Sequence, residues 1–117
     1  MNRIYYLKTC STCQRILKEL QPGPDVELID IKQQNIDAET LDWIKSKTGS
    51  YESLFSKKAM KYRALGLNEK ELSDIDFRNY ILEEYTFLKR PYIILDNGVF
   101  IGNSKAVVAE AKKAIEK

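Results

Sequence analysis

The fold is decided by residues 3–20, which read RIYYLKTCSTCQRILKEL. The first part, residues 3–7, is rich in β-branched and aromatic side chains, which predicts a strand. The apolar residues that follow recur along one stripe, which predicts a helix from about Ser11. These residues are Ile16, Leu17 and Leu20. The stretch Pro22-Gly23-Pro24 then ends the helix.

Two cysteines, Cys10 and Cys13, stand at the junction between this strand and this helix. Cys10 lies where the unpaired N–H groups and the dipole of a helix N-terminus favour a thiolate over a thiol. Cys13 lies one turn later on the same helical face, so the two thiols can close a small disulfide. We expect Cys10 to attack as a nucleophile and Cys13 to resolve the mixed disulfide. The flanking Lys8 and Arg15 would further favour the thiolate. The alternatives are two cysteines that pack as small hydrophobes, or half of a metal site.

Strand patterns return after this unit and again near the end of the chain. Residues 26–31 predict a second strand, and strand–helix–strand in about 30 residues favours a parallel pair with a right-handed crossover. Residues 91–95 and 99–101 predict two more strands. Between them Asp96-Asn97-Gly98 is a hairpin signal, because Asn-Gly accepts the positive φ angles of a type I′ turn. A last helix is expected from about Ser104. Its apolar face is Val107, Val108, Ala111, Ala114 and Ile115, and its last turns carry Lys112, Lys113 and Lys117.

The pattern between these two parts is helical throughout. Asp37 is expected to cap a first helix, which Gly49 ends. A second helix is expected at about residues 57–65 and a third at about 76–87. Without this block the order is β-α-β followed by β-β-α, which is the order of thioredoxin.

We therefore expect an α/β, thioredoxin-like fold with a mixed sheet. The prediction is one domain over residues 1–117, with a helical subdomain inserted at about 36–88. The 117 residues are 44% hydrophobic and 31% charged, the balance of an ordinary globular domain. The formal charge of +2 is far from that of a protein that coats nucleic acid, so we expect no direct nucleic-acid binding. Neither a signal peptide nor a membrane helix is predicted, and we expect a cytoplasmic protein.

The chain contains no histidine. This excludes Cys-His and Ser-His nucleophilic sites, histidine general bases and imidazole-ligated zinc. Two cysteines alone cannot close a tetrahedral zinc site. In a reducing compartment we expect a cysteine pair to serve redox chemistry before we expect a structural disulfide. We therefore expect no bound metal or organic cofactor.

Two further features are candidates for a site. Arg90-Pro91 precedes the predicted third strand, where a proline need not donate to the ladder. An X-Pro bond can also be cis, and both isomers are open from the sequence. The second feature is a basic cluster on the second helix of the block, either a solvated face or an anion pocket or docking surface. Its members are Lys57, Lys58, Lys61 and Arg63.

Three motifs follow one another in a specific order: Thr9-Cys10-Ser11-Thr12-Cys13-Gln14-Arg15, Gly49-x4-Leu54 before the basic helix, and Leu88-Lys89-Arg90-Pro91 before the hairpin. Together they resemble the arsenate reductase/Spx family over almost the whole chain. The resemblance implies a thioredoxin-like fold with a helical insertion. It also implies one of two functions, that of glutaredoxin-coupled arsenate reductases or that of Spx regulators, which bind the RNA polymerase α-subunit.

The resemblance also implies roles for individual residues. Cys10 matches the nucleophilic cysteine of the family. Cys13 matches a second cysteine of the Spx branch, whereas the arsenate reductases of this type have none there. Arg90 matches an arginine that holds the substrate oxyanion, and Pro91 would shape the pocket wall opposite the dithiol.

Two further arginines of the family pattern are replaced here. One position holds Ser56, with Lys57 next to it, and the other falls at Gly102-Asn103. An arginine holds a tetrahedral oxyanion in a planar fork, whereas a lysine is only a point charge. Lys57 or Lys58 would substitute only in part.

The leading hypothesis is a thiol–disulfide oxidoreductase that acts on a small anionic or disulfide substrate. Cys10 and Cys13 would be catalytic, and Arg90, Pro91, Lys57 and Lys58 would bind the substrate. Glutathione, glutaredoxin or thioredoxin would donate electrons. The first alternative is an Spx-like redox-sensing transcription regulator that binds the RNA polymerase α-subunit. The second is a redox-inert member that serves as an interaction module.

Overall fold

A computed structural model describes residues 1–116, so Lys117, placed by the sequence in the last turn of the final helix, lies outside the described residues. The chain divides into two compact units. One consists of Met1–Gln34 together with the chain from Arg90 onward, and we call it the sheet unit. The other is Asn35–Lys89, the helical unit. The prediction that the chain behaves as one domain stays a prediction.

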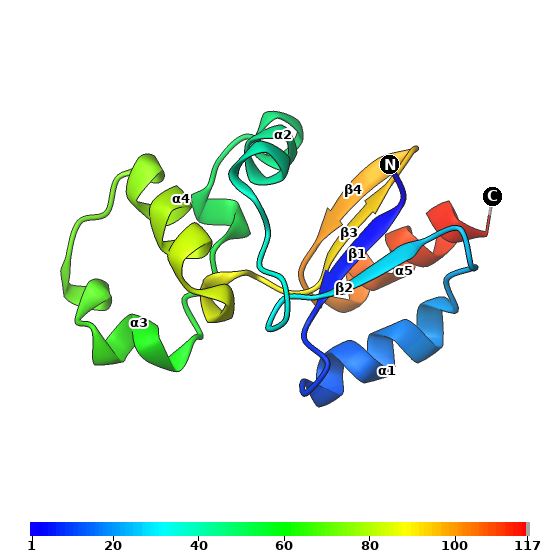
Figure 1. Ribbon diagram of the computed structural model, residues 1–117, viewed down its shortest axis with the longest axis horizontal. Helices are drawn as coiled ribbons and strands as arrows, with labels where there is room; N and C mark the ends of the chain where they lie inside the picture. The colour runs from blue at the N-terminus through cyan, green and yellow to red at the C-terminus, as the bar shows by residue number, and fades with distance from the viewer. Residues whose placement is uncertain (117) are drawn as a thin grey trace. The chain divides into compact units, whose positions relative to one another are not determined.

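The sheet unit contains a four-stranded mixed sheet in the order β2-β1-β3-β4 (Figure 1). The strands are β1 (Arg3–Tyr6), β2 (Glu27–Asp30), β3 (Tyr92–Leu95) and β4 (Gly98–Ile101). Strand β1 pairs in parallel with β2 and antiparallel with β3, and β3 pairs antiparallel with β4. The register places Ile4 between Leu28 and Ile93. The predicted α/β fold with a mixed sheet is confirmed.

Two helices, α1 (Ser11–Leu20) and α5 (Lys105–Ile115), pack on one face of this sheet. Their apolar stripes and the sheet residues that face them form a single buried cluster. Its members are Ile4, Ile16, Leu20, Ile93, Leu95, Val108 and Ala111. Helix α1 ends at Leu20 before the Pro-Gly-Pro stretch, and Ser104 caps α5 by accepting from the Val107 N–H. None of the helices in the described part of the chain is both long and apolar enough to cross a membrane.

The β3–β4 hairpin forms where the sequence predicts it, but its turn is not type I′. Leu95 pairs with Gly98, so the loop consists of Asp96 and Asn97. Neither residue has the positive φ that type I′ requires. The loop is instead tied to the start of the chain, because the Asp96 N–H donates to Asn2 Oδ1 and Asn2 Nδ2 donates to Asp96 Oδ2, both at 3.0 Å.

The helical unit contains α2 (Ala38–Thr48), α3 (Met60–Ala64) and α4 (Asp74–Glu83). Three short 3-10 helices accompany them, at Glu52–Leu54, Leu67–Glu69 and Tyr85–Phe87. The predicted ends of α2 are confirmed: Asp37 accepts from the Thr40 N–H at 2.8 Å, and Gly49 closes the helix with a φ of 101°.

The bounds of the other two helices differ from those predicted. Helix α3 begins at Met60, so Lys57 and Lys58 lie in the turn before it. The chain is held extended up to that turn, because Phe55 forms a bridge with Leu88 and the Ser56 N–H donates to the Phe87 carbonyl at 2.7 Å.

Helix α4 begins two residues before the predicted start, because Ser73 and Asp76 form a capping box. It ends at Glu83, and the remaining predicted turn is the 3-10 helix Tyr85–Phe87. The sequence pattern alone had merged the two.

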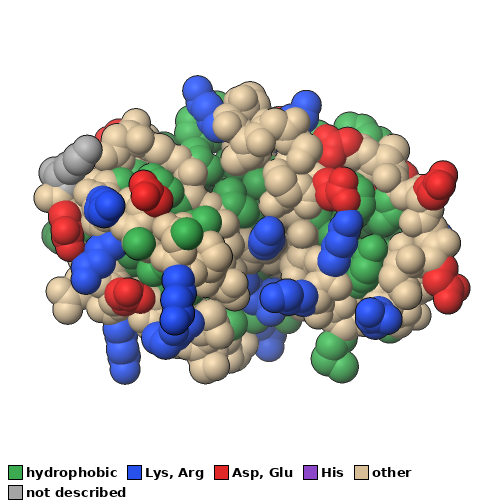
Figure 2. Space-filling view, turned by 180° about the vertical axis from the view of Figure 1, so that it is seen from behind, with side chains coloured by type: hydrophobic (Ala, Val, Ile, Leu, Met, Phe, Trp, Pro, Cys, Tyr) green, Lys and Arg blue, Asp and Glu red, His purple; other side chains and the backbone are tan. Residues whose placement is uncertain are grey.

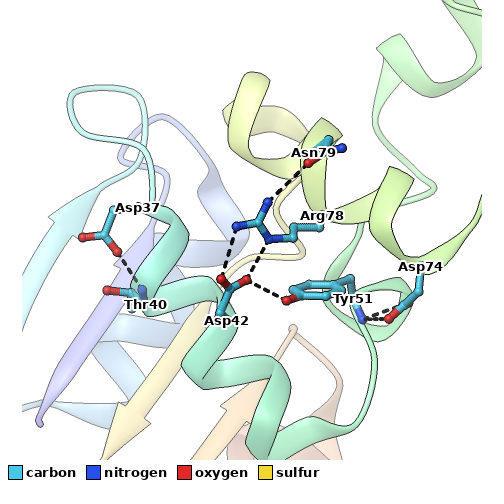
Figure 3. Close-up of polar contacts among 7 residues, drawn as sticks. All are labelled: Asp37, Thr40, Asp42, Tyr51, Asp74, Arg78 and Asn79. Carbon is cyan, nitrogen blue, oxygen red and sulfur yellow. Dashed lines mark hydrogen bonds and ion pairs between the residues drawn. The ribbon is translucent and has the colours of Figure 1, made fainter.

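The helical unit combines a buried aliphatic core, which includes Leu41, Ile44 and Ile81, with aromatic packing and a polar network. Phe55 stacks on Phe87 with ring centroids 4.9 Å apart, and it meets Phe77 edge-on at the same distance. On another part of the unit Asp42 of α2 accepts from Arg78 Nε of α4 at 2.8 Å and from the Tyr51 hydroxyl at 2.6 Å (Figure 3). The network therefore joins α2, α4 and the segment between them.

Candidate active site

Cys10 and Cys13 occupy two different environments at the start of α1. Cys10 is the N-cap residue, with an extended backbone, and its side chain is half-buried. Cys13 lies in the first helical turn and is only 1% exposed. Both cysteines are free thiols. An accessible sulfur thus lies above a buried one.

The surroundings of Cys10 favour its thiolate. Partial burial acts against the charge, but hydrogen bonds outweigh it and lower the pKa of Cys10 below its ordinary value. They come, in decreasing order of effect, from the Cys13 N–H, the Cys13 thiol, the Arg90 side chain and the Thr12 N–H. Two of these donors are the free N–H groups of the first helical turn, as the sequence predicts for a helix N-terminus.

Cys13 is shifted in the opposite direction. Burial raises the pKa of the Cys13 thiol to about 11. The negative charge of Cys10 adds to the rise, whereas a hydrogen bond from the Leu7 N–H and the charge of Arg90 partly offset it. Cys10 is therefore the more acidic thiol of the pair.

Arg90 belongs to the sheet unit and acts on both sulfurs. It lies directly before β3, and the Arg90–Pro91 peptide bond is cis. Pro91 is buried, and its carbonyl accepts from the Gly102 N–H at 2.9 Å. The structure therefore brings together Cys10, Cys13 and Arg90. The cation that lowers the pKa of Cys10 most is Arg90, and not the expected Lys8 or Arg15.

Leu7 is a contributor that sequence analysis did not identify. Its carbonyl accepts from the Cys10 N–H at 3.0 Å, which closes a tight turn through Lys8 and Thr9. Its own N–H acts on the Cys13 sulfur. Both contributions come from the backbone, so the identity of the side chain carries no signal for them.

The remaining predicted site residues, Lys57 and Lys58, belong to the helical unit. Lys57 forms an ion pair with Glu52 at 2.5 Å, and Lys58 is exposed. Their role in anion binding stays a prediction. Basic and acidic side chains are interspersed on the face of the molecule drawn in Figure 2.

Within residues 1–116 no three side chains of His, Cys, Asp or Glu gather as a metal ion would require. The chemistry that the described site can offer is that of its sulfurs and of the Arg90 guanidinium. A thiolate attacks a sulfur or another electrophile, the second thiol displaces the product, and the guanidinium favours a negatively charged group nearby.

Comparisons with known proteins bear on the family and the fold. The model of the ArsC family matches residues 5–111. Among solved structures, arsenate reductase from Vibrio cholerae is 20% identical with a TM-score of 0.76, covering 94% of this chain and 96% of its own, a likeness that shows the fold alone. No curated protein matches the sequence.

Two further solved structures are somewhat more similar in sequence. A possible arsenate reductase from Streptococcus mutans is 27% identical with a TM-score of 0.71, covering 90% of this chain and 92% of its own. A Staphylococcus aureus protein is 28% identical with a TM-score of 0.73, covering 94% of this chain and 97% of its own. The family match and these neighbours support a thiol-dependent, oxidoreductase-like role.

Proposed function

The chain belongs to the ArsC family, and we propose that it is a thiol–disulfide oxidoreductase with Cys10 as nucleophile and Cys13 as resolving thiol. The observation that carries this proposal is the placement of the two thiols at the start of α1, where Cys10 is the half-buried N-cap residue and Cys13 is only 1% exposed. The pKa of the accessible Cys10 is lowered, whereas that of the buried Cys13 is raised to about 11. In such a dithiol the accessible, more acidic cysteine is the nucleophile, and the buried cysteine is the resolving thiol.

The reaction proceeds in two exchanges. The Cys10 thiolate attacks one sulfur of a substrate disulfide, forms a mixed disulfide and expels the other sulfur as a thiolate. Cys13 then loses its proton and attacks the Cys10 sulfur, which releases the second substrate thiolate and leaves a Cys10–Cys13 disulfide. Two electrons have passed from the protein to the substrate. Two equivalents of glutathione, or the dithiol of glutaredoxin or thioredoxin, return them.

The first exchange also makes Cys13 easier to ionise. Once Cys10 is in a mixed disulfide, its negative charge no longer raises the pKa of Cys13. The Leu7 N–H and Arg90 remain, and both favour the Cys13 thiolate. Formation of the mixed disulfide thus removes one contribution to the raised pKa of Cys13, while burial, the largest contribution, remains.

Arg90 selects the substrate class in this proposal. Its guanidinium stands beside the reactive sulfur and would bind a carboxylate of a disulfide such as oxidised glutathione. A tetrahedral oxyanion such as arsenate needs more charge-assisted donors. The family resemblance expects two further arginines, but Ser56 and Gly102-Asn103 occupy their positions here. We therefore propose that an anionic disulfide, and not arsenate, is the preferred substrate.

The test is a redox titration of the purified protein. The protein is equilibrated in glutathione buffers, quenched by alkylation, and the state of Cys10 and Cys13 is read from the intact mass. The proposal expects a reversible bridge with a potential between about −180 and −280 mV, the range of working cellular dithiols. A bridge that forms only under a strong oxidant would overturn it.

A second candidate is an Spx-like redox-sensing regulator that binds the RNA polymerase α-subunit. Cys13 favours it, because the family resemblance places a second cysteine at this position in the Spx branch and none in the arsenate reductases of this type. Capture of the polymerase α-subunit by the oxidised protein, and less of it by the reduced protein, would support this candidate. Turnover of a disulfide substrate without such capture would support the oxidoreductase.

A further inference from the structure

The turn that carries Cys10 is bound from two sides at one residue, Lys8. Gln14 Nε2, from α1, donates to the Lys8 carbonyl at 2.7 Å. The Lys8 N–H donates to Asp30 Oδ1, at the end of β2, at 3.3 Å. The Cys10 N–H also donates to the Leu7 carbonyl at 3.0 Å, so the turn is closed on itself and bound to both α1 and β2.

The position of this turn bears directly on both sulfurs. Cys10 depends on the N–H groups of Thr12 and Cys13, and the Cys13 sulfur depends on the N–H of Leu7. Hydrogen bonds weaken steeply as their distance and angle depart from the preferred geometry. A small displacement of the turn therefore weakens the contacts that separate the two thiols.

We propose that Gln14 is a positioning residue for the dithiol. Its amide binds the Lys8 carbonyl while Asp30 accepts from the Lys8 N–H, and together they keep Cys10 at the N-terminus of α1. The side chain of Gln14 is exposed, so Gln14 does not act by packing in the hydrophobic core. Gln14 touches neither substrate nor sulfur in this scheme and acts through the backbone of Lys8. The inference rests on the proposed function, because a positioned thiolate matters only where Cys10 reacts.

The test is the pH dependence of Cys10 alkylation in the reduced protein. Gln14→Met keeps the length and helix preference of the side chain but removes the donor. We expect its alkylation midpoint to rise by about half a unit to one unit, which is about a three- to tenfold loss of thiolate below the midpoint. Gln33→Met is the matched control, because it makes the same neutral change at another exposed residue of the sheet unit. We expect it to titrate as the wild type.

Asp30 provides an independent arm. Asp30→Asn keeps an acceptor oxygen and should titrate at or slightly below the wild-type midpoint, whereas Asp30→Ala removes the acceptor and should shift the midpoint upward. The charge effect alone would shift both variants downward, because each loses a negative charge that disfavours a thiolate. The expected rise in Asp30→Ala therefore separates positioning from electrostatics.

The outcomes distinguish this inference from the proposed function. A wild-type Cys10 with an ordinary thiol midpoint overturns the proposed function. A low wild-type midpoint that Gln14→Met leaves unchanged, or that Gln33→Met shifts equally, overturns the positioning role alone. A rise in Gln14→Met accompanied by loss of the thermal unfolding transition would indicate a structural role and would also overturn it. The inference is supported when the midpoint moves and the thermal transition stays.

Discussion

The two units of this protein use polar side chains in different ways. In the sheet unit an aliphatic cluster that includes Ile4, Ile16 and Ile93 fills the space between the sheet and two helices. One group of its polar contacts lies at the dithiol, where Arg90 and the helix N-terminus favour a thiolate. In the helical unit the principal polar network, Asp42 with Tyr51 and Arg78, ties helices together (Figure 3).

This difference separates stability from chemistry. The sheet unit is stabilised by burial, so the half-buried Cys10 can be changed at little cost to the fold. The helical unit adds aromatic contacts to a buried aliphatic core, so truncation of these buried side chains should affect folding. The predictions below set one unit against the other.

The largest effect is expected from Cys10→Ser. The variant should lose all thiol–disulfide exchange turnover, because a serine hydroxyl is not ionised at neutral pH and cannot form the mixed disulfide. Cys13→Ser should instead trap the mixed disulfide between Cys10 and the substrate, visible as a mass increase that a reductant removes. Both variants should keep the far-UV circular dichroism of the wild type. Full turnover by Cys10→Ser would refute the mechanism.

The next effect compares the two cores. Phe87→Ala in the helical unit should cost about 3–5 kcal/mol of the free energy of unfolding, and Ile93→Ala in the sheet unit about 2–5 kcal/mol. Both side chains are buried, at 1% and 0% exposure. Trp43 is the single tryptophan and lies in the helical unit, whereas Cys13 is buried in the sheet unit. Tryptophan fluorescence and thiol exposure therefore report separately on the two units during denaturant unfolding.

This pair of probes also tests the single-domain prediction. If the chain is one cooperative domain, either variant should shift both transitions together. If Phe87→Ala shifts only the fluorescence transition, the helical unit unfolds independently and the prediction is wrong.

The sequence predicted the sheet unit well because its signals are local. Periods of two and of 3.6 residues mark its strands and helices, and turn residues separate them. The helix at 57–65 was predicted to begin too early, since nothing local shows that the bridge between Phe55 and Leu88 holds the chain extended. The type I′ turn was wrong for a similar reason. Asp96 is bound to Asn2, which lies 94 residues away in the chain.

The candidate site was predictable where it depends on spacing. Cys10 and Cys13 follow from the position of a Cys-x-x-Cys pair at a helix start. The contribution of Arg90 came from a family resemblance, because no local pattern shows which distant cation reaches a sulfur. The roles of Leu7 and Gln14 depend on the path of one turn, and only coordinates reveal it.

Arg90→Met should produce a smaller effect, confined to the chemistry of the sheet unit. Loss of the guanidinium should raise the pKa of Cys10 by about one unit, so alkylation below the midpoint slows about tenfold. Arg90→Lys should recover only part of this, because an ammonium is a point charge without the planar fork. The pH profile of alkylation measures both. An unchanged midpoint in Arg90→Met would show that the helix N-terminus alone lowers the pKa.

The smallest effect is expected in the helical unit, at Asp42. Hydrogen bonds from Arg78 and Tyr51 lower the pKa of Asp42. A carboxyl whose folded pKa lies below its unfolded value stabilises the protein above the unfolded pKa, and this stabilisation is lost as the pH falls through the folded pKa. Asp42 is 44% exposed, so solvent screening limits the contribution to about 1 kcal/mol or less. Asp42→Asn should therefore lower the unfolding free energy slightly at neutral pH and reduce its decline below about pH 4.

The measurement is urea unfolding followed by Trp43 fluorescence between neutral and acidic pH. Asp96→Asn is the matched control, because Asp96 also has a lowered pKa but lies in the sheet unit. If Asp42 acts as argued, Asp42→Asn alone should flatten the acid limb seen by a probe within its own unit. If both variants flatten the pH dependence of the unfolding free energy equally, the two units unfold together. Protonation of a carboxyl in either unit then changes the stability of both.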